Sequence, residues 1–254
     1  SAAPMPYARI LAGSTPIFAD ANGEFSVDLG AGETVTLNSQ VRGQYFVVDN
    51  NGGANAQVVQ TANAGEFTTL LHNAQNAGEQ TRAEVNAYIH SNIVRDFALA
   101  QNPSYPTIAN QTNFAVNVNI GDNCNAFYNG SSINFYTSGG GCSNTANTTV
   151  VYHEYGHHLI NVGGSGQGAY GEGMSDTVAV AITDSPDLAL GFQNNCNSPL
   201  RSAVNSVQYP CDSPIHSCGR TLSGSVWDTR EALVASGVEN YRELIAGWVI
   251  NSIL

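Results

Sequence analysis

Residues 150–160 are the most informative part of the chain and read Val150-Val151-Tyr152-His153-Glu154-Tyr155-Gly156-His157-His158-Leu159-Ile160. It contains the pattern His-Glu-x-x-His, which is typical of a helix that binds zinc and carries its own general base. His153 and His157 are four residues apart, so on a helix they lie on one face, one turn from each other. Two imidazoles in this arrangement can bind one metal ion, while Glu154 can reach a water on that ion without being a ligand. The apolar residues at both ends of the stretch predict a buried helix.

A catalytic zinc site needs a third protein ligand, and the sequence offers one downstream. Glu172 stands in Gly171-Glu172-Gly173-Met174-Ser175-Asp176, fifteen residues after His157. A histidine six residues after His157 would be the alternative ligand, but that position holds Gly163. Glu172 and Asp176 are four residues apart, so one carboxylate can bind the metal while the other accepts the free ring N–H of a zinc-binding histidine. Two histidines, one glutamate and an open fourth position predict a catalytic zinc site. The five-residue pattern alone also fits a core helix with surface histidines, an alternative that this second motif disfavours.

These motifs resemble those of the gluzincin metallopeptidases, and within them the thermolysin and fungalysin families. The sequence of residues 171–176 most resembles that of fungalysin-type bacterial secreted peptidases. A third motif, Asn125-Ala126-Phe127-Tyr128-Asn129-Gly130, is similar to the edge strand with which the thermolysin family holds its substrate. The resemblance covers roughly residues 80–230 and implies substrate binding by Asn125, Ala126 and Tyr128.

The resemblance implies an α+β, two-lobed, thermolysin-like fold. We expect residues 1–162 to form a β-rich N-terminal lobe that ends in the zinc-binding helix at the cleft. We expect residues 163–254 to form a mainly helical C-terminal lobe that carries the third zinc ligand. Glycines at 163, 164, 166 and 168 predict a hinge between the lobes.

Local patterns agree with this division. Alternating polarity predicts strands at 25–29, 34–37, 44–48 and 114–120, with a further strand at 133–136. A helical pattern covers about residues 79–100, with an apolar stripe of Val85, Tyr88, Ile89, Ile93 and Phe97. His90 beside this stripe is predicted to be a packed or solvent-edge histidine, not a ligand. Further helices are predicted at 148–161, 172–182, 227–234 and 241–254, with a loop at 187–214.

The charge balance narrows the class of partner. The chain has 254 residues, 8 basic and 20 acidic ones, and a net charge of −12. Nucleic acids and anionic membranes both require clusters of Lys and Arg, so neither is an expected partner. No apolar run approaches the ~20 residues of a membrane span, so membrane insertion is not expected. With only 11% charged residues, the composition favours a secreted, extracellular protein. The resemblance implies a peptide or protein substrate, and we expect a monomer.

Five cysteines, Cys124, Cys142, Cys196, Cys211 and Cys218, indicate disulfides and an oxidising compartment. Cys124 and Cys142 bracket the 125–130 motif, and a disulfide between them would hold the substrate edge. Cys196–Cys211 is a second plausible pair that would leave Cys218 unpaired, and Cys211–Cys218 is the alternative. Sequence alone does not decide the pairing.

The resemblance also implies a mechanism. Zinc acidifies a bound water, and Glu154 takes the proton from this water and later delivers it to the leaving amine. The oxyanion needs a hydrogen-bonding partner, for which His216 is the best candidate because it precedes a predicted helix start at 223–228. The family's oxyanion tyrosine has no clear counterpart, since Tyr170 is the one tyrosine between the two site helices. His158 is predicted to lie on the helix surface, pointing away from the metal.

The main prediction is therefore a secreted zinc endopeptidase. An exopeptidase of the same class and a catalytically inactive binding or adhesion module are the alternatives. Zn²⁺ is the expected cofactor. Ca²⁺ is a further expectation, because secreted relatives of this kind often carry it. The acidic residues at 20–24 have a spacing that could hold the ion, although an ordinary turn is favoured there.

Overall fold

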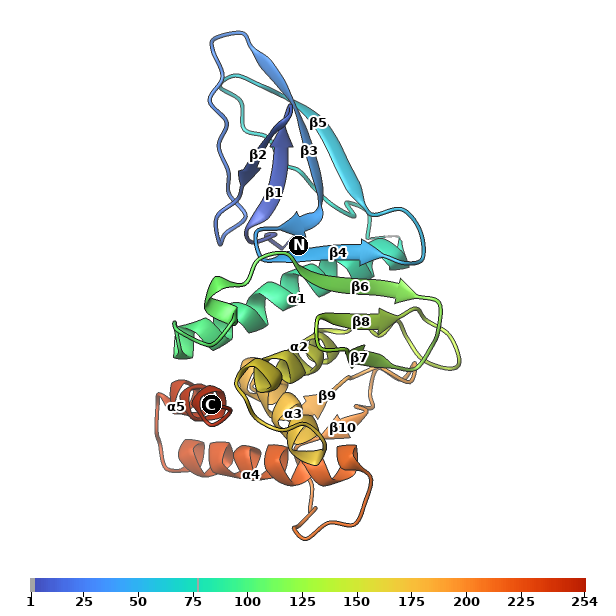
Figure 1. Ribbon diagram of the computed structural model, residues 1–254, viewed down its shortest axis with the longest axis vertical. Coiled ribbons are helices and arrows are strands. Elements are labelled where there is room, and N and C mark those ends of the chain that lie inside the picture. The colour runs from blue at the N-terminus through green and yellow to red at the C-terminus, as the bar shows by residue number, and fades with distance from the viewer. Residues whose placement is uncertain (1–2, 77) are drawn as a thin grey trace.

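The computed structural model describes residues 3–76 and 78–254 and shows a mixed α+β fold (Figure 1). The N-terminal strands are β1 (Ala8–Ala12), β2 (Thr15–Phe18), β3 (Thr34–Gly43), β4 (Phe46–Asn50) and β5 (Gln57–Asn63). The middle of the chain contains α1 (Glu79–Gln101), the 3-10 helix η1 (Ile108–Asn110), β6 (Phe114–Ile120), β7 (Ala126–Tyr128) and β8 (Ser132–Tyr136). The C-terminal part contains α2 (Thr148–Val162), α3 (Ala169–Thr183), β9 (Asp187–Leu188), β10 (Arg201–Ser202), α4 (Ile215–Ala235) and α5 (Tyr241–Asn251).

Eight strands form one sheet in the order β2-β1-β3-β4-β6-β8-β7, with β5 paired to β3, and β9 and β10 form a separate two-stranded sheet. The N-terminal strands β1, β2, β3 and β5 pair antiparallel, whereas β4, β6 and β8 are parallel neighbours. Val48, Val116 and Ile133 stand opposite one another in register and are buried, so an apolar row crosses the parallel strands. The last strand, β7, pairs antiparallel with β8 and lies at the end of the sheet nearest α2 (Figure 1).

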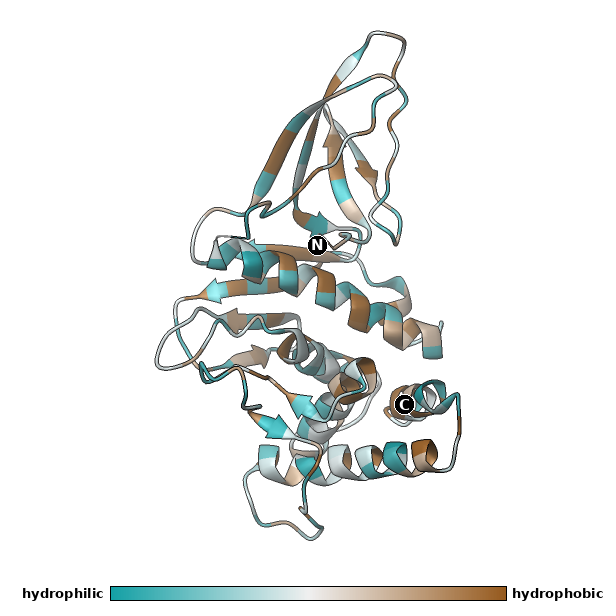
Figure 2. Ribbon diagram, turned by 180° about the vertical axis from the view of Figure 1, so that it is seen from behind, coloured by the Kyte–Doolittle hydropathy of each residue, from teal (hydrophilic) through white to brown (hydrophobic). Residues whose placement is uncertain are grey.

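Helix α1 covers one face of β4 and β6, and Figure 2 shows it in front of these strands. Of the predicted apolar stripe, Tyr88 is buried, Val85, Ile89 and Phe97 are partly buried against the main core, and Ile93 is 37% exposed. The buried face consists mainly of small and polar residues, namely Ala83, Glu84, Ala87, Ser91, Asn92, Val94, Arg95 and Ala98. Small side chains let the helix backbone approach the sheet closely, so close packing favours them at the contact over the larger residues of the apolar stripe.

The main hydrophobic core joins the parallel strands to all five α-helices. Helix α2 lies at its centre, where Val151, Tyr155, Leu159 and Ile160 have no exposed surface. A smaller cluster lies under the N-terminal strands and includes Ile10 and Leu37. The division of the chain at residues 162 and 163 stays a prediction, and the main core contains residues from both sides of it.

Two other local expectations were wrong, and one disulfide pairing that the sequence left open is now decided. Residues 25–29 form no strand, because Phe25 and Val27 pack against the small cluster without a hydrogen-bonded partner strand. Helix α4 begins at Ile215, earlier than expected, so His216 lies in its first turn and not in a loop. The second disulfide joins Cys211 to Cys218, the alternative to the first-named pair, and Cys196 pairs with no other described cysteine.

Within the described ranges, no helix combines the length and the apolar character that a membrane crossing requires. The acidic 20–24 segment is a turn in which Asp20 Oδ1 accepts hydrogen bonds from the backbone N–H groups of Asn22 and Glu24. Among the residues that the structure describes, it lies outside any group of metal-ligating side chains, so the expected calcium site has no support.

Candidate metal centre and active site

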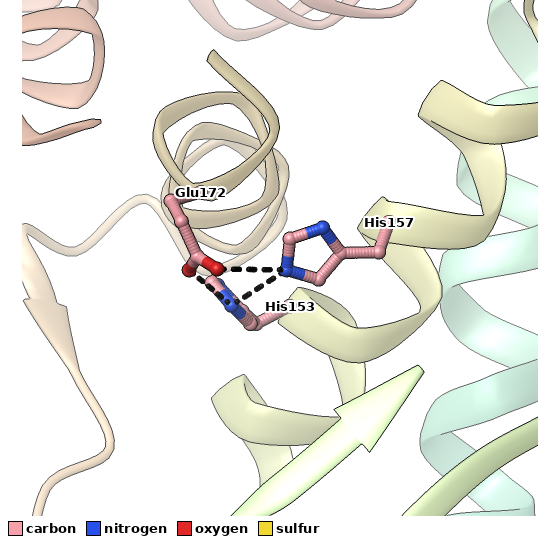
Figure 3. A group of neighbouring side chains, drawn as sticks. All are labelled: His153, His157 and Glu172. Carbon is pink, nitrogen blue, oxygen red and sulfur yellow. Dashed lines mark hydrogen bonds and ion pairs between the residues drawn. The ribbon is translucent and has the colours of Figure 1, made fainter. Parts of the chain in front are cut away.

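Helix α2 carries the two histidines of the predicted metal site. Asn147 caps its N-terminus by accepting a hydrogen bond from the backbone N–H of Thr149, which fixes where the helix begins. His153 and His157 then follow on one face, one turn apart. Their Nε2 atoms face each other at 3.1 Å, with both side chains largely buried (Figure 3).

Helix α3 packs so closely on α2 that Glu172 reaches both histidines. The contact depends on Gly156, because a Cβ at this position would lie 2.9 Å from the Cα of Ser175. Glu172 Oε2 lies 3.2 Å from His153 Nε2, and Glu172 Oε1 lies 3.7 Å from His157 Nε2. The three candidate ligand atoms lie within 4.8 Å of one another, so the structure brings together the predicted ligand set.

Asp176 holds the outer side of His153. Its Oδ1 lies 2.7 Å from His153 Nδ1, and the carboxylate also receives two hydrogen bonds from Arg201, of 2.8 and 2.7 Å. Burial alone would disfavour the charged form of Asp176, but His153 and Arg201 outweigh it and hold the pKa of the carboxyl below its usual range. Arg201, on β10, was not predicted, although it is the only basic residue between positions 185 and 214.

The two histidines differ in charge in the absence of a metal. Burial opposes protonation of His153, but its contacts with Asp176 and Glu172 are stronger and raise its pKa to about 10. For His157, burial and the neighbouring charge of His153 lower the pKa to about 4. At neutral pH the pair therefore carries one positive charge, on His153, while His157 is neutral.

Glu154 lies beside the cluster and is 6% exposed. Burial is the main cause that raises its pKa to about 7, with the positive charge of His153 acting against this shift. A backbone hydrogen bond from Tyr128 also favours the charged form. A carboxyl group with a pKa near neutrality can both accept and release a proton.

The predicted substrate residues lie on and next to the edge strand β7. Asn125 is exposed, and Ala126 and Tyr128 are partly buried. The Tyr128 hydroxyl lies 3.0 Å from His158 Nδ1 and donates to the Gly130 carbonyl, so its ring is engaged away from the cluster. Only the backbone of Tyr128 faces Glu154. A substrate role for these three residues stays a prediction.

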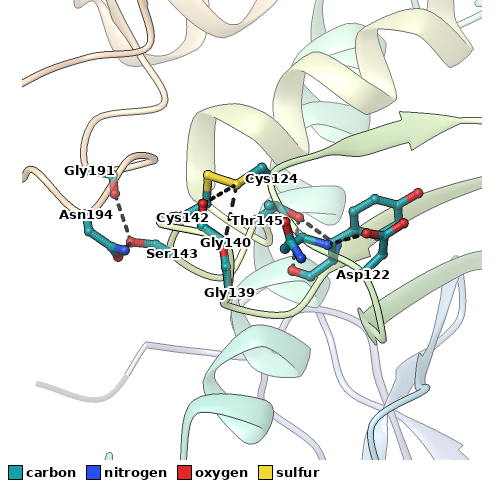
Figure 4. Close-up of a disulfide and its surroundings, with 11 residues drawn as sticks. Asp122, Cys124, Gly139, Gly140, Cys142, Ser143, Thr145, Gly191 and Asn194 are labelled. Carbon is teal, nitrogen blue, oxygen red and sulfur yellow. Dashed lines mark hydrogen bonds between the residues drawn. A yellow bond between two sulfur atoms is a disulfide. The ribbon is translucent and has the colours of Figure 1, made fainter.

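A disulfide anchors the start of β7. Cys124 is bonded to Cys142, which belongs to the turn at 139–142 (Figure 4). The turn is closed by hydrogen bonds between Gly139 and Cys142. Ser143, the next residue, donates to the Gly191 carbonyl at 2.8 Å. The disulfide that the sequence suggested on either side of the 125–130 motif is therefore present.

His216 reaches the cluster from α4. Its Nε2 lies 3.2 Å from Glu172 Oε2, and its side chain is 54% exposed. Helix α4 comes this close because Gly173 and Gly219 meet, with a Cβ on Gly173 lying only 2.4 Å from the Gly219 carbonyl oxygen. The predicted catalytic role of His216 is not tested by its position alone.

Three side chains near the site can be compared with their predicted environments. His158 is 5% exposed and packs against Phe114, so it is not a surface residue, although it does lie away from the cluster. The Tyr170 hydroxyl donates to the carbonyl of Ser252, at 3.3 Å, and not towards the cluster. His90 contacts Tyr152 and Thr148 and is a packed histidine.

The structure thus combines a mixed α+β fold with two histidines on one buried helix and a glutamate on the next. Among solved structures, the chain is similar to the precursor of protealysin, a metalloproteinase from Serratia proteamaculans, with a TM-score of 0.51 over 90% of each chain. The sequence identity is 13%, so this likeness concerns the fold. No model of a known protein family matches the sequence, and no curated protein matches it either.

Proposed function

We propose that this protein is a secreted zinc-dependent endopeptidase. The observation that carries the proposal is the convergence of His153, His157 and Glu172, with the buried carboxyl of Glu154 beside them. The two disulfides support secretion, because disulfides persist in oxidising compartments. The fungalysin-like sequence of residues 171–176 supports a relationship to bacterial peptidases of that type.

The donor set fits a zinc ion. The outward Nδ1 atoms of His153 and His157 face the oxygens of Asp176 and Gln167, at 2.7 and 2.8 Å. Both rings therefore turn an Nε2 atom inward, towards the Glu172 carboxylate. Two imidazole nitrogens and one carboxylate are the ligand set of a catalytic zinc, which acidifies bound water and polarises a carbonyl.

Residues around the cluster have positions that suit three roles in peptide hydrolysis, which are proton transfer, stabilisation of the oxyanion and substrate binding. Glu154 holds a proton in transit, taking it from the attacking water and giving it to the leaving amine. His216 is partly exposed and donates a hydrogen bond towards the oxyanion. The edge strand β7 pairs with β8 on one side, so its other side offers main-chain groups to an extended substrate.

Cleavage of an unfolded protein substrate tests the proposal, with chelation followed by restoration of zinc. We expect activity to disappear with chelation and to return with zinc, and internal fragments to indicate endopeptidase activity. Release of terminal residues alone would instead identify an exopeptidase. Glu154→Gln should lower kcat at least 10²-fold while zinc stays bound. Zinc-loaded protein that cleaves no substrate would support the inactive binding module and reject the proposal.

A further inference from the structure

Gln167 contacts His157 at two points. It belongs to the joint between α2 and α3, residues 163–168, and it is otherwise exposed. Its Oε1 lies 2.8 Å from His157 Nδ1, and its Nε2 donates to the main-chain carbonyl of His157 at 3.1 Å. A carbonyl oxygen can only accept, so the amide nitrogen must face it and the amide oxygen must face the ring. His157 therefore carries its proton on Nδ1 and turns the lone pair of Nε2 inward.

Gly171 leaves the space that this contact needs. A Cβ on Gly171 would lie 2.6 Å from Gln167 Oε1 and 3.5 Å from His157 Nδ1. Gly171 lies in α3 with an ordinary helical backbone, where alanine is the better helix former. A glycine here is explained by the side chain of Gln167, which occupies the position that a Cβ would take.

We infer that Gln167 is a positioning residue for His157, made possible by Gly171. The inference rests on the proposed function, because the orientation of His157 matters for activity only if this residue binds the metal. Gln167 supplies for His157 what Asp176 supplies for His153, which is an acceptor on the outer ring nitrogen. Glu154, Glu172 and Asp176 already bring three carboxyl groups to the centre. A neutral amide orients the ring without adding a fourth negative charge.

The test is the zinc affinity of purified variants, measured by competition with a chelator. Gln167→Ala and Gly171→Ala should each weaken zinc binding by about tenfold, the first by removing the amide and the second by displacing it. The double variant should be no weaker than either single one, since both changes remove the same contact. Gly166→Ala is the matched control, because a Cβ at this position of the joint meets nothing within 4 Å.

Two further readouts separate positioning from a general structural role. The visible spectrum of the Co²⁺-substituted protein should change in Gln167→Ala and Gly171→Ala and stay unchanged in Gly166→Ala. The unfolding midpoint of the metal-free protein should be the same in Gln167→Ala as in the wild type. Unchanged zinc affinity and spectrum in Gln167→Ala, with a wild type that binds zinc, would overturn this inference alone. A wild type that binds no zinc would overturn the proposed function and the inference together.

Discussion

Asp176 has no exposed surface, yet its carboxylate faces one nitrogen of His153 and two of Arg201. The charge of a buried carboxylate is tolerated only where such partners compensate for lost hydration. The same contacts direct His153 towards Glu172. A single buried side chain therefore stabilises the fold and orients a predicted metal ligand.

Replacing Asp176 by Asn keeps the shape of the side chain but removes the counter-charge of Arg201. We expect Asp176→Asn to lower the free energy of unfolding by about 3 kcal/mol, as measured by urea denaturation of the metal-free protein. Asp228→Asn on the exposed side of α4 is the control and should change it by less than about 0.5 kcal/mol. A loss below about 1 kcal/mol in Asp176→Asn would contradict this account of the pair.

The pKa of Glu154 predicts how activity depends on pH. Burial raises this pKa to about 7 without a metal, and a cation beside the carboxylate can only lower it. Because the base must be deprotonated, kcat/KM should fall on acidification, with a midpoint at or below pH 7. The measurement is kcat/KM between about pH 4 and pH 8 with zinc in excess. Activity that rises steadily as pH falls through this range would exclude Glu154 as the base.

Burial of Glu154 also makes the free energy of unfolding depend on pH, in the opposite direction to the activity. Because folding raises the pKa of this carboxyl group, the group contributes stability while it is protonated. This contribution is complete below its unfolded pKa and is lost as pH rises towards about 7. In Glu154→Gln, this pH-dependent loss of stability should be absent from the metal-free protein.

At the scale of elements, glycines set how closely the site helices approach one another. Gly156 lets α2 meet α3, and the Gly173–Gly219 pair lets α3 meet α4. These two contacts bring Glu172 and His216 to the histidines of α2. The positions of four predicted site residues therefore depend on glycines, whose lack of a side chain allows the helices to pack closely.

The contact at Gly156 makes a specific prediction. Gly156→Ala should push α3 away from α2, because its Cβ would meet the backbone of Ser175. We expect a loss of about 1–3 kcal/mol in unfolding free energy and weaker zinc binding. Gly247→Ala in α5 is the control, since its Cβ would meet only the end of Gln101, at 3.5 Å. Zinc affinity equal to that of the wild type in Gly156→Ala would show that the spacing of the helices does not control the site.

At the level of the whole molecule, the candidate metal centre lies where several elements meet. Its side chains come from α2, α3 and α4, with Arg201 from β10 and the edge strand β7 beside Glu154. In the unfolded chain these residues are far apart, so an ion that binds all three ligands binds only the folded state.

Zinc should therefore stabilise the folded protein by mass action. At a free zinc concentration 100-fold above Kd, we expect about 2.7 kcal/mol of added stability, seen as a higher Tm that is reversed by a chelator. His153→Ala should abolish the zinc-dependent shift. An equal shift in that variant would mean that zinc binds elsewhere on the protein.

The local features of the site follow from the amino-acid sequence alone. The spacing of His153 and His157 follows from helix periodicity, and the carboxylates at 172 and 176 lie on one face for the same reason. The helices that carry them were predicted within a few residues, and four strands, β3, β4, β6 and β8, lie where alternating polarity placed them. These features depend on neighbours in the sequence, so a local pattern can reveal them.

Only the tertiary structure decided which distant residues meet. Arg201 reaches Asp176 from 25 positions away, and Gln167 reaches back to His157 around a glycine-rich joint. The buried face of α1 also escaped prediction, because close packing against the sheet favoured alanines over the larger apolar residues. The disulfide partner of Cys211 was left open for the same reason. Each of these depends on the relative placement of whole elements, which arises from packing and which no local periodicity encodes.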